Sequence, residues 1–181
     1  MAKRSASPTG KERTFSADEI IVSKTDTKGR LTYVNDVFLR VSSYEEEELL
    51  GEQHNVIRHP EMPRCIFKLL WERIQSGKEI FAYVNNMASN GDHYWVLAHV
   101  TPCFDGNGQI VGYHSNRRVP PKAAFDTILP LYAKLLAEER RHADRKAGLD
   151  SSYAMLMKAV ADSGHASYDR LIFAISAPAR S

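Results

Sequence analysis

The segment of residues 51–63, GEQHNVIRHPEMP, constrains the fold of this chain more than any other stretch. Each of its two prolines fixes its own backbone angle and pushes the residue before it towards extended geometry. We therefore expect no helix across residues 60–63. The segment should be a short, stiff loop that presents Arg58 and His59, either to an anionic or heteroaromatic ligand or simply to solvent.

Composition limits the class of protein. The 181 residues have room for one domain of ordinary size and an appendage. With 43% hydrophobic and 25% charged residues, the composition is typical of a soluble globular protein. The net charge of +2 is too small to indicate nucleic-acid binding, and no run of lysine and arginine alternates with aromatic residues.

The cellular location follows from cysteines and apolar runs. Cys65 and Cys103 lack CxxC spacing, so the sequence predicts neither a disulfide framework nor a structural zinc site and fits a reducing compartment. The N-terminus has no apolar region of a secretory signal, and no apolar run is long enough to cross a bilayer. We expect a cytoplasmic protein without membrane insertion.

The order of predicted elements gives the fold class. Two strands come first, short helices follow, and three more strands complete the pattern. Glycine-containing turns join successive strands, which favours antiparallel pairing. The sequence therefore predicts an α+β fold, a five-stranded antiparallel sheet with helices on one face. The predicted strands are 19–25, 30–34, 79–87, 93–104 and 109–117. The predicted helices are 37–41, a second helix that carries Glu45–Glu48 in its first turn, and 64–76. Ser42 or Ser43 should cap the second helix.

The C-terminal part is predicted to be a helical extension. Residues 123–146 show a helical pattern whose first half has an apolar face, while 138–146 alternates charge sign and should be solvated. Gly148 should end this helix, and Asp150 or Ser151 should cap the next. The apolar face predicts an interface with the sheet or with a second copy, and we favour a homodimer. The predicted parts are thus a disordered N-terminus (1–15), a domain (16–120) and the extension (121–181).

Five strings of residues follow one another along the chain: Asn35-Asp-x-Phe38, the 51–63 segment, Asn90-Gly-Asp-His-Tyr-Trp95, Thr101-Pro102 and Gly112-Tyr113. In order and spacing they resemble the PAS domain of bacterial aerotaxis receptors. The resemblance covers about residues 18–120 and continues into Pro130-Leu-Tyr132. It implies a PAS fold and a sensory domain rather than an enzyme, with FAD held non-covalently between the sheet and the helices. It also implies a redox, oxygen or energy signal passed to a chemotaxis receptor, a kinase or another signalling partner.

The same resemblance implies a set of flavin-binding or signalling residues. Several of them have a plainer interpretation from their positions. Asn35 could cap a helix and tie it to a strand, and the aromatic pair on the 64–76 helix could belong to the core. Arg58 and His59 could cap that helix or pair with Glu61. The implied residues are Asn35, Arg58, His59, Phe67, Trp71 and Asn86.

The chain departs from the family pattern at three positions. Ile80 stands where the family has tryptophan, and Asn85 and Met87 stand where it has lysine and arginine. A second interpretation is therefore a ligand-free PAS module for interaction or dimerisation. A third is a haem sensor with His99 or His114 as the metal ligand.

Two further expectations concern the class of chain. We see no nucleophile elbow, phosphate loop or metal-ligand spacing, so we expect no enzyme. The resemblance does not extend to the receptors' membrane segment and long coiled coil, so we expect a free-standing PAS protein. Of Tyr94 and Trp95, which are adjacent on one predicted strand, only one can face a ligand.

Overall fold

The computed structural model describes residues 6–177. They fall into two compact units. The first contains the chain up to Pro60 together with Arg73–Val119, and the second contains Glu61–Glu72 together with the chain from Pro120 onwards. The division of the chain falls near residue 120, and residues 61–72 belong with the C-terminal helices.

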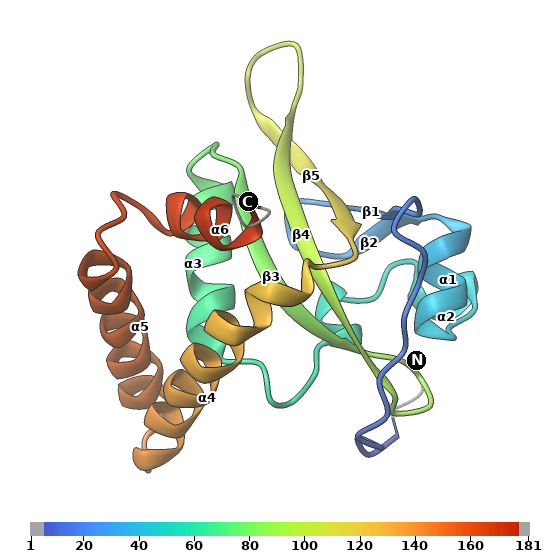
Figure 1. Ribbon diagram of the computed structural model, residues 1–181. Helices are drawn as coiled ribbons and strands as arrows, with labels where there is room; N and C mark the ends of the chain where they lie inside the picture. The colour runs from blue at the N-terminus through green and yellow to red at the C-terminus, as the bar shows by residue number, and fades with distance from the viewer. Residues whose placement is uncertain (1–5, 178–181) are drawn as a thin grey trace. The chain divides into compact units, whose positions relative to one another are not determined.

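The first unit is built on the predicted five-stranded antiparallel sheet (Figure 1). The strands lie in the order β2-β1-β5-β4-β3, and every neighbouring pair is antiparallel. The predicted fold class is confirmed. The strands are β1 (Ile21–Thr25), β2 (Leu31–Val34), β3 (Ile80–Met87), β4 (His93–Phe104) and β5 (Ile110–Arg118).

Two aspartates shape the tight turns of this sheet. The side-chain Oδ1 of Asp26 accepts the backbone N–H groups of Lys28 and Arg30, which closes the β1–β2 turn. Asp105 repeats this arrangement in the β4–β5 turn. The β4–β5 hairpin extends past its neighbours, because β3 pairs with β4 only as far as Val100 (Figure 1).

Short helices separate β2 from β3. A capping box at Glu45 begins the second of them, so the predicted cap at Ser42 or Ser43 is wrong: the reciprocal bonds of Glu45 and Glu48 satisfy the free N–H groups there. No helix crosses residues 60–63, as predicted. The helices are α1 (Asp36–Ser42), α2 (Glu46–Leu49), the 3₁₀ helix η1 (His54–Ile57) and α3 (Arg64–Gln75), most of which belongs to the second unit.

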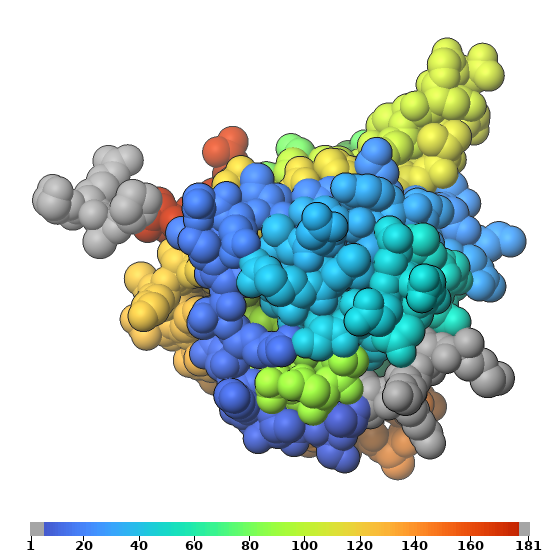
Figure 2. All heavy atoms as spheres, turned by 90° about the vertical axis from the view of Figure 1, so that its right-hand side faces the viewer, coloured from blue at the N-terminus to red at the C-terminus, as the bar shows by residue number. Residues whose placement is uncertain are grey.

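Residues 6–15, which we call the N-terminal arm, run along the β3–β4 turn (Figure 2). The backbone N–H of Thr9 donates to the carbonyl of Gly91 at 3.0 Å, and that of Arg13 donates to His93 at 2.7 Å. The prediction of disorder is therefore wrong for the arm, because its backbone groups find partners on a turn about 80 residues away. Residues 1–5 lie outside the described residues.

Beyond residue 120, the described part of the second unit packs three helices and a short 3₁₀ segment. Ile128, Tyr132 and Leu135 are buried, and the hydroxyl groups of Tyr132 and Tyr168 lie 3.2 Å apart. The apolar face that predicted an interface with the sheet or with a second copy thus packs within this unit. Besides most of α3, the unit contains η2 (Lys122–Ala124), α4 (Phe125–Arg141), α5 (Arg145–Asp162) and α6 (Tyr168–Ser176).

The break between α4 and α5 corrects two predictions. Asp144, not Asp150 or Ser151, caps α5 by accepting the N–H of Ala147. Gly148 lies inside α5, where a Cβ atom would approach the carbonyl oxygen of Glu139 to 2.6 Å. This glycine therefore allows α4 and α5 to pack closely, instead of ending a helix.

The charged end of α4 had been expected to be solvated, but part of it is buried. Glu138 and Glu139 are both buried. Ser151 donates a hydrogen bond to Glu138. The hydrogen bonds from Ser151 and His142 lower the pKa of Glu138 to about 2. Partners on the next helix thus allow these carboxylates to be buried.

Candidate functional site

One face of the sheet carries a row of buried polar side chains, and we call it the inward face. Strand pairing defines it, since directly opposed residues share a face. Ser23 opposes Ser115, and Arg117 opposes Ala98. Phe38 of α1 lies over this face, with its ring centroid 5.6 Å from the guanidinium carbon of Arg117.

Arg117 is the charge at the centre of this face, and it is only 4% exposed. Its Nη2 donates to the hydroxyl of Ser23 at 3.0 Å and to Nε2 of His54 at 2.5 Å. Burial lowers the pKa of Arg117 to about 10, which leaves it charged at neutral pH. The inward face therefore presents a desolvated cation.

His54 is neutral in this arrangement. Burial and the adjacent Arg117 lower its pKa to about 3, against the effect of a hydrogen bond to its own backbone. Part of the residue remains accessible, but its Nε2 lies against the buried guanidinium. Because Nε2 must accept from Arg117, the proton of the neutral ring is assigned to Nδ1.

Several buried polar atoms have no hydrogen-bond partner within residues 6–177. Such atoms are uncommon in folded proteins and commonly mark a site for water, an ion or a ligand. On the inward face Tyr94 is 1% exposed, and burial raises the pKa of its hydroxyl, so the phenol stays protonated and able to donate. These atoms include Arg117 Nη1, Tyr94 Oη, Tyr44 Oη, Ser115 Oγ and Asn86 Nδ2.

Small side chains occupy the middle of the inward face. Ala82 on β3 opposes Ala98 on β4, which in turn opposes Arg117. Ser115 and Ser23 are neighbours in the adjoining row. A planar group could lie against such a surface without meeting bulky side chains.

The structure brings three of the predicted residues to one end of the sheet. Arg58 forms an isolated antiparallel bridge with Asn86, which pairs the 51–63 loop with the edge strand β3. The ring of buried His59 meets that of His93 edge-on, with centroids 5.8 Å apart. Asn86 opposes Tyr94, so its side chain belongs to the inward face.

Asn35 is a helix cap that ties strand to helix, as the plainer interpretation predicted. Its Oδ1 accepts the N–H of Phe38 in α1 and that of Val22 in β1, and its Nδ2 donates to Ile20. A direct contact of Asn35 with a ligand stays a prediction.

Phe67 and Trp71 belong to the second unit. They lie one turn apart on α3 and are half-buried, whereas Ile66, Leu69 and Ile74 of the same helix are buried. These two aromatic residues are therefore not central core residues of α3, and their contact with a ligand stays a prediction.

Strand parity settles where the departures from the family pattern lie. Asn85 and Met87 alternate with Asn86 and so lie on the face opposite to it, together with Trp95. Only Ile80, which opposes Val100, is on the inward face. A lysine and an arginine at positions 85 and 87 would therefore lie on the face opposite to Asn86. Of the two adjacent aromatic residues, Tyr94 faces inward and Trp95 does not.

The two histidines considered as haem ligands are also on the opposite face. His99 opposes Asn116, and its ring stacks on Phe81 with centroids 4.1 Å apart. His114 opposes Thr101 and alternates with the inward residues of β5. No group of three or more histidine, cysteine or acidic side chains within residues 6–177 is placed to hold a metal ion.

Sequence reasoning missed the central residues of the polar cluster. It named Arg58 and His59 of the loop but not His54, and it treated Arg117 as the end of a strand. The alternation Tyr113, Ser115, Arg117 on β5 was the available signal, because it places the arginine with the buried residues.

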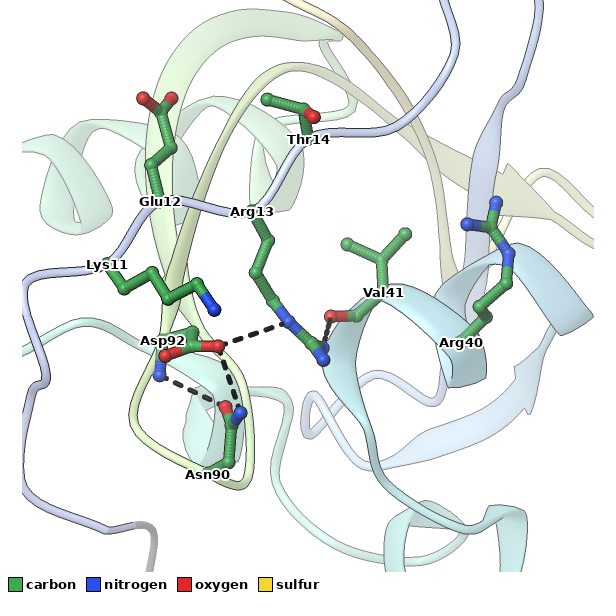
Figure 3. Close-up of a pocket in the computed structure, with 8 residues that line it drawn as sticks. All are labelled: Lys11, Glu12, Arg13, Thr14, Arg40, Val41, Asn90 and Asp92. Carbon is green, nitrogen blue, oxygen red and sulfur yellow. Dashed lines mark hydrogen bonds and ion pairs between the residues drawn. The ribbon is translucent and has the colours of Figure 1, made fainter.

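A separate surface pocket of about 490 Å³ lies between the N-terminal arm, α1 and the β3–β4 turn (Figure 3). Arg13 reaches across it, donating to the carbonyl of Val41 at 2.6 Å and pairing with Asp92 at 3.4 Å. Lys11 and Arg40 also line it. Arg13 and Asp92 hold the arm, since Asp92 also accepts a hydrogen bond from Thr9. None of the predicted site residues lines this pocket.

Sequence comparison assigns part of this chain to a known family. Residues 31–117 match the family model of the PAS fold, so the chain contains a PAS domain. It is 38% identical over 120 residues to the aerotaxis receptor of Escherichia coli (strain K12). The aligned residues make up 66% of this chain and 24% of the receptor.

Two other relatives are more distant. The nitrogen fixation regulatory protein of Klebsiella pneumoniae is 25% identical over 99 residues, or 55% of this chain and 20% of that protein. Phototropin-1A of Oryza sativa subsp. japonica is 26% identical over 80 residues, or 44% of this chain and 9% of that protein. The chain thus spans about a quarter or less of the length of these relatives.

Solved structures share the fold. The dark-state light-oxygen-voltage domain of the blue-light photoreceptor Aureochrome1 aligns with a TM-score of 0.52 at 26% identity, covering 67% of this chain and 84% of that one. A PAS domain from Colwellia psychrerythraea aligns with a TM-score of 0.51 at 18% identity, covering 55% and 85%. No helix within residues 6–177 is long and apolar enough to span a membrane.

Proposed function

We propose that this PAS domain is a cytoplasmic sensor of redox, oxygen or energy state that holds FAD non-covalently against the inward face. The observation that carries the proposal is the set of buried polar atoms, Nη1 of the Arg117 guanidinium among them, that have no hydrogen-bond partner within residues 6–177. A buried charge and unpaired donors are costly unless a ligand completes them. The named relatives support a sensory role, and one solved neighbour is a light-oxygen-voltage domain studied with a flavin analogue.

The residues fit a flavin. Its ring is planar and apolar on its faces and carries carbonyl and nitrogen acceptors at its edge, which matches small side chains flanked by donors. Asn86 Nδ2, Tyr94 Oη and Ser115 Oγ are available for such an edge. Bound FAD would supply a redox-active ring whose hydrogen-bonding pattern changes on reduction.

The remaining predicted residues would act around these donors. Arg58 holds the 51–63 loop on β3 beside Asn86, so the loop and the amide would respond together to a change at the ligand. Asn35 fixes α1, and with it Phe38, relative to β1. Phe67 and Trp71 remain proposed ligand contacts from α3. Transmission requires that the two states of the ligand favour different conformations.

A titration of flavin-free protein with FAD tests the proposal, with quenching of flavin fluorescence as the readout. Saturable binding of one FAD per chain is expected. Failure to bind at protein concentrations of tens of micromolar would contradict it. Asn86→Leu, which removes one donor from the inward face, should weaken binding more than Asn116→Leu, which changes an amide on the opposite face.

The proposal extends to partners. The relatives' names suggest a chemotaxis receptor, a kinase or another signalling protein as the recipient of the signal, with no catalysis by the domain itself. A homodimer remains part of the proposal, although the predicted face of α4 is used within the second unit. A monomeric mass by light scattering at tens of micromolar would contradict the dimer.

A second candidate is a ligand-free interaction module. The β4–β5 hairpin favours it, because Phe104 and Val111 are 52% and 53% exposed on the part of the hairpin that has no flanking strand. Ile80 on the inward face, where the family has tryptophan, also favours it. Stoichiometric flavin in the native protein would contradict this second function.

A further inference from the structure

Arg117 is held on one side only. Its hydrogen bonds to Ser23 and to His54 both come from Nη2. The other terminal nitrogen, Nη1, is buried and has no partner within residues 6–177. The guanidinium is thus fixed in place while one of its donors stays unused.

Neither neighbour neutralises the charge. Ser23 is uncharged, and the low pKa of His54 keeps its ring neutral. No carboxylate is among the contacts of Arg117 in the described part of the chain, and its charge interacts instead with the phenol of Tyr94. A buried cation without an anion is destabilising, and an anionic or electron-rich acceptor would relieve this cost.

The position of Arg117 matches such an acceptor on a planar ligand. It opposes Ala98 and Ile21 on the inward face, while Phe38 covers its guanidinium. Tyr94, whose hydroxyl has no hydrogen-bond partner in the described structure, interacts electrostatically with it. The two groups could therefore serve one ligand edge.

We propose that Nη1 of Arg117 donates to the carbonyl edge of the bound flavin ring, with His54 and Ser23 acting as positioning residues that fix the guanidinium. This inference rests on the proposed function and adds a residue to it. A charge-assisted hydrogen bond of this kind is stronger than a neutral one.

The test compares FAD with riboflavin, which has the same ring but no phosphates. Arg117→Met should weaken the binding of both by the same factor, about 10- to 100-fold, because one charged hydrogen bond to the ring is lost. Arg118→Met changes the exposed neighbour on β5 and is the matched control, with both affinities expected to stay unchanged. Circular dichroism and the melting temperature of the flavin-free variants show whether each is folded.

The outcomes separate this inference from the proposed function. Wild-type protein that binds neither flavin contradicts both. Wild-type protein that binds both, with Arg117→Met binding them equally well, contradicts only this inference, and a loss confined to FAD would mean that Arg117 contacts a phosphate. If Arg117→Met does not fold, Arg117→Lys takes its place: its shorter ammonium cannot reproduce the fork geometry, so riboflavin affinity should fall several-fold.

Discussion

The side-chain carboxylate of Glu139 accepts the backbone N–H of Cys65 at 3.1 Å, at the start of α3. Its other oxygen accepts from Nε of Arg64 at 2.9 Å. An acid from α4 thus caps α3 and complements the positive end of its dipole. This contact joins the C-terminal helices to the helix that follows the 51–63 loop.

Replacing Glu139 by glutamine should therefore destabilise the protein. The exchange keeps the shape but removes the charge that receives Arg64 and Cys65, and the side chain is only 5% exposed. We expect a loss of about 1–3 kcal/mol in the free energy of unfolding, measured by urea denaturation. Glu47→Gln, an exposed exchange of the same kind, should change it by less than about 0.5 kcal/mol. Equal effects of the two would refute the capping role.

The neutral state of His54 predicts a pH dependence of stability. Its pKa is about 3 in the folded protein and 6.5 in its ordinary environment, so the unfolded chain binds a proton first as the pH falls. Stability from this group is complete above pH 6.5 and declines as the pH drops towards 3, by up to about 1.4 kcal/mol per pH unit. The window from about pH 6.5 to 5 lies above the ordinary titration of carboxylates.

His54→Gln should remove this decline, because the amide oxygen can still accept from Arg117 and does not titrate in the window. His114→Gln is the comparison, since that half-buried histidine also has a lowered pKa but no contact with Arg117 by hydrogen bond. Denaturation curves at several pH values check the difference. A wild-type slope no steeper than that of His54→Gln would show that His54 is not held neutral.

The N-terminal arm depends on Gly91. This residue has φ +91°, and a Cβ atom there would lie 2.2 Å from the carbonyl oxygen of Ser7. Gly91→Ala should displace the arm and speed tryptic cleavage after Lys11 and Arg13. Gly108→Ala imposes comparable backbone strain, with φ +77° but nothing within 4 Å of the added atom, and should leave cleavage of the arm unchanged. Similar cleavage rates in the two variants would contradict the docking.

The sequence could predict most of the sheet because the signals were local. Alternation and turn residues gave all five strands, and Asn35 was recognised as a cap by its place between a strand and a helix. The arm could not be predicted in this way, because its partners lie in the β3–β4 turn, far along the chain. Gly148 was misread since glycine usually ends helices, whereas here it makes room for Glu139.

The candidate site was only partly predictable. The loop motif indicated Arg58 and His59, and the structure adds what their backbone and rings contact. Arg117 was overlooked because an arginine near the end of a strand is ordinarily exposed. Its role follows from strand register, which places it opposite Ala98, and register comes from pairing rather than from the composition of one strand.

The most direct test of the central claim is the visible absorption spectrum of the freshly purified protein, with the released cofactor identified by chromatography. The polar inward face around Arg117 predicts flavin absorption bands and release of about one FAD per chain. A protein that shows no such bands, and acquires none after incubation with FAD, would contradict the claim that this PAS domain is a flavin sensor.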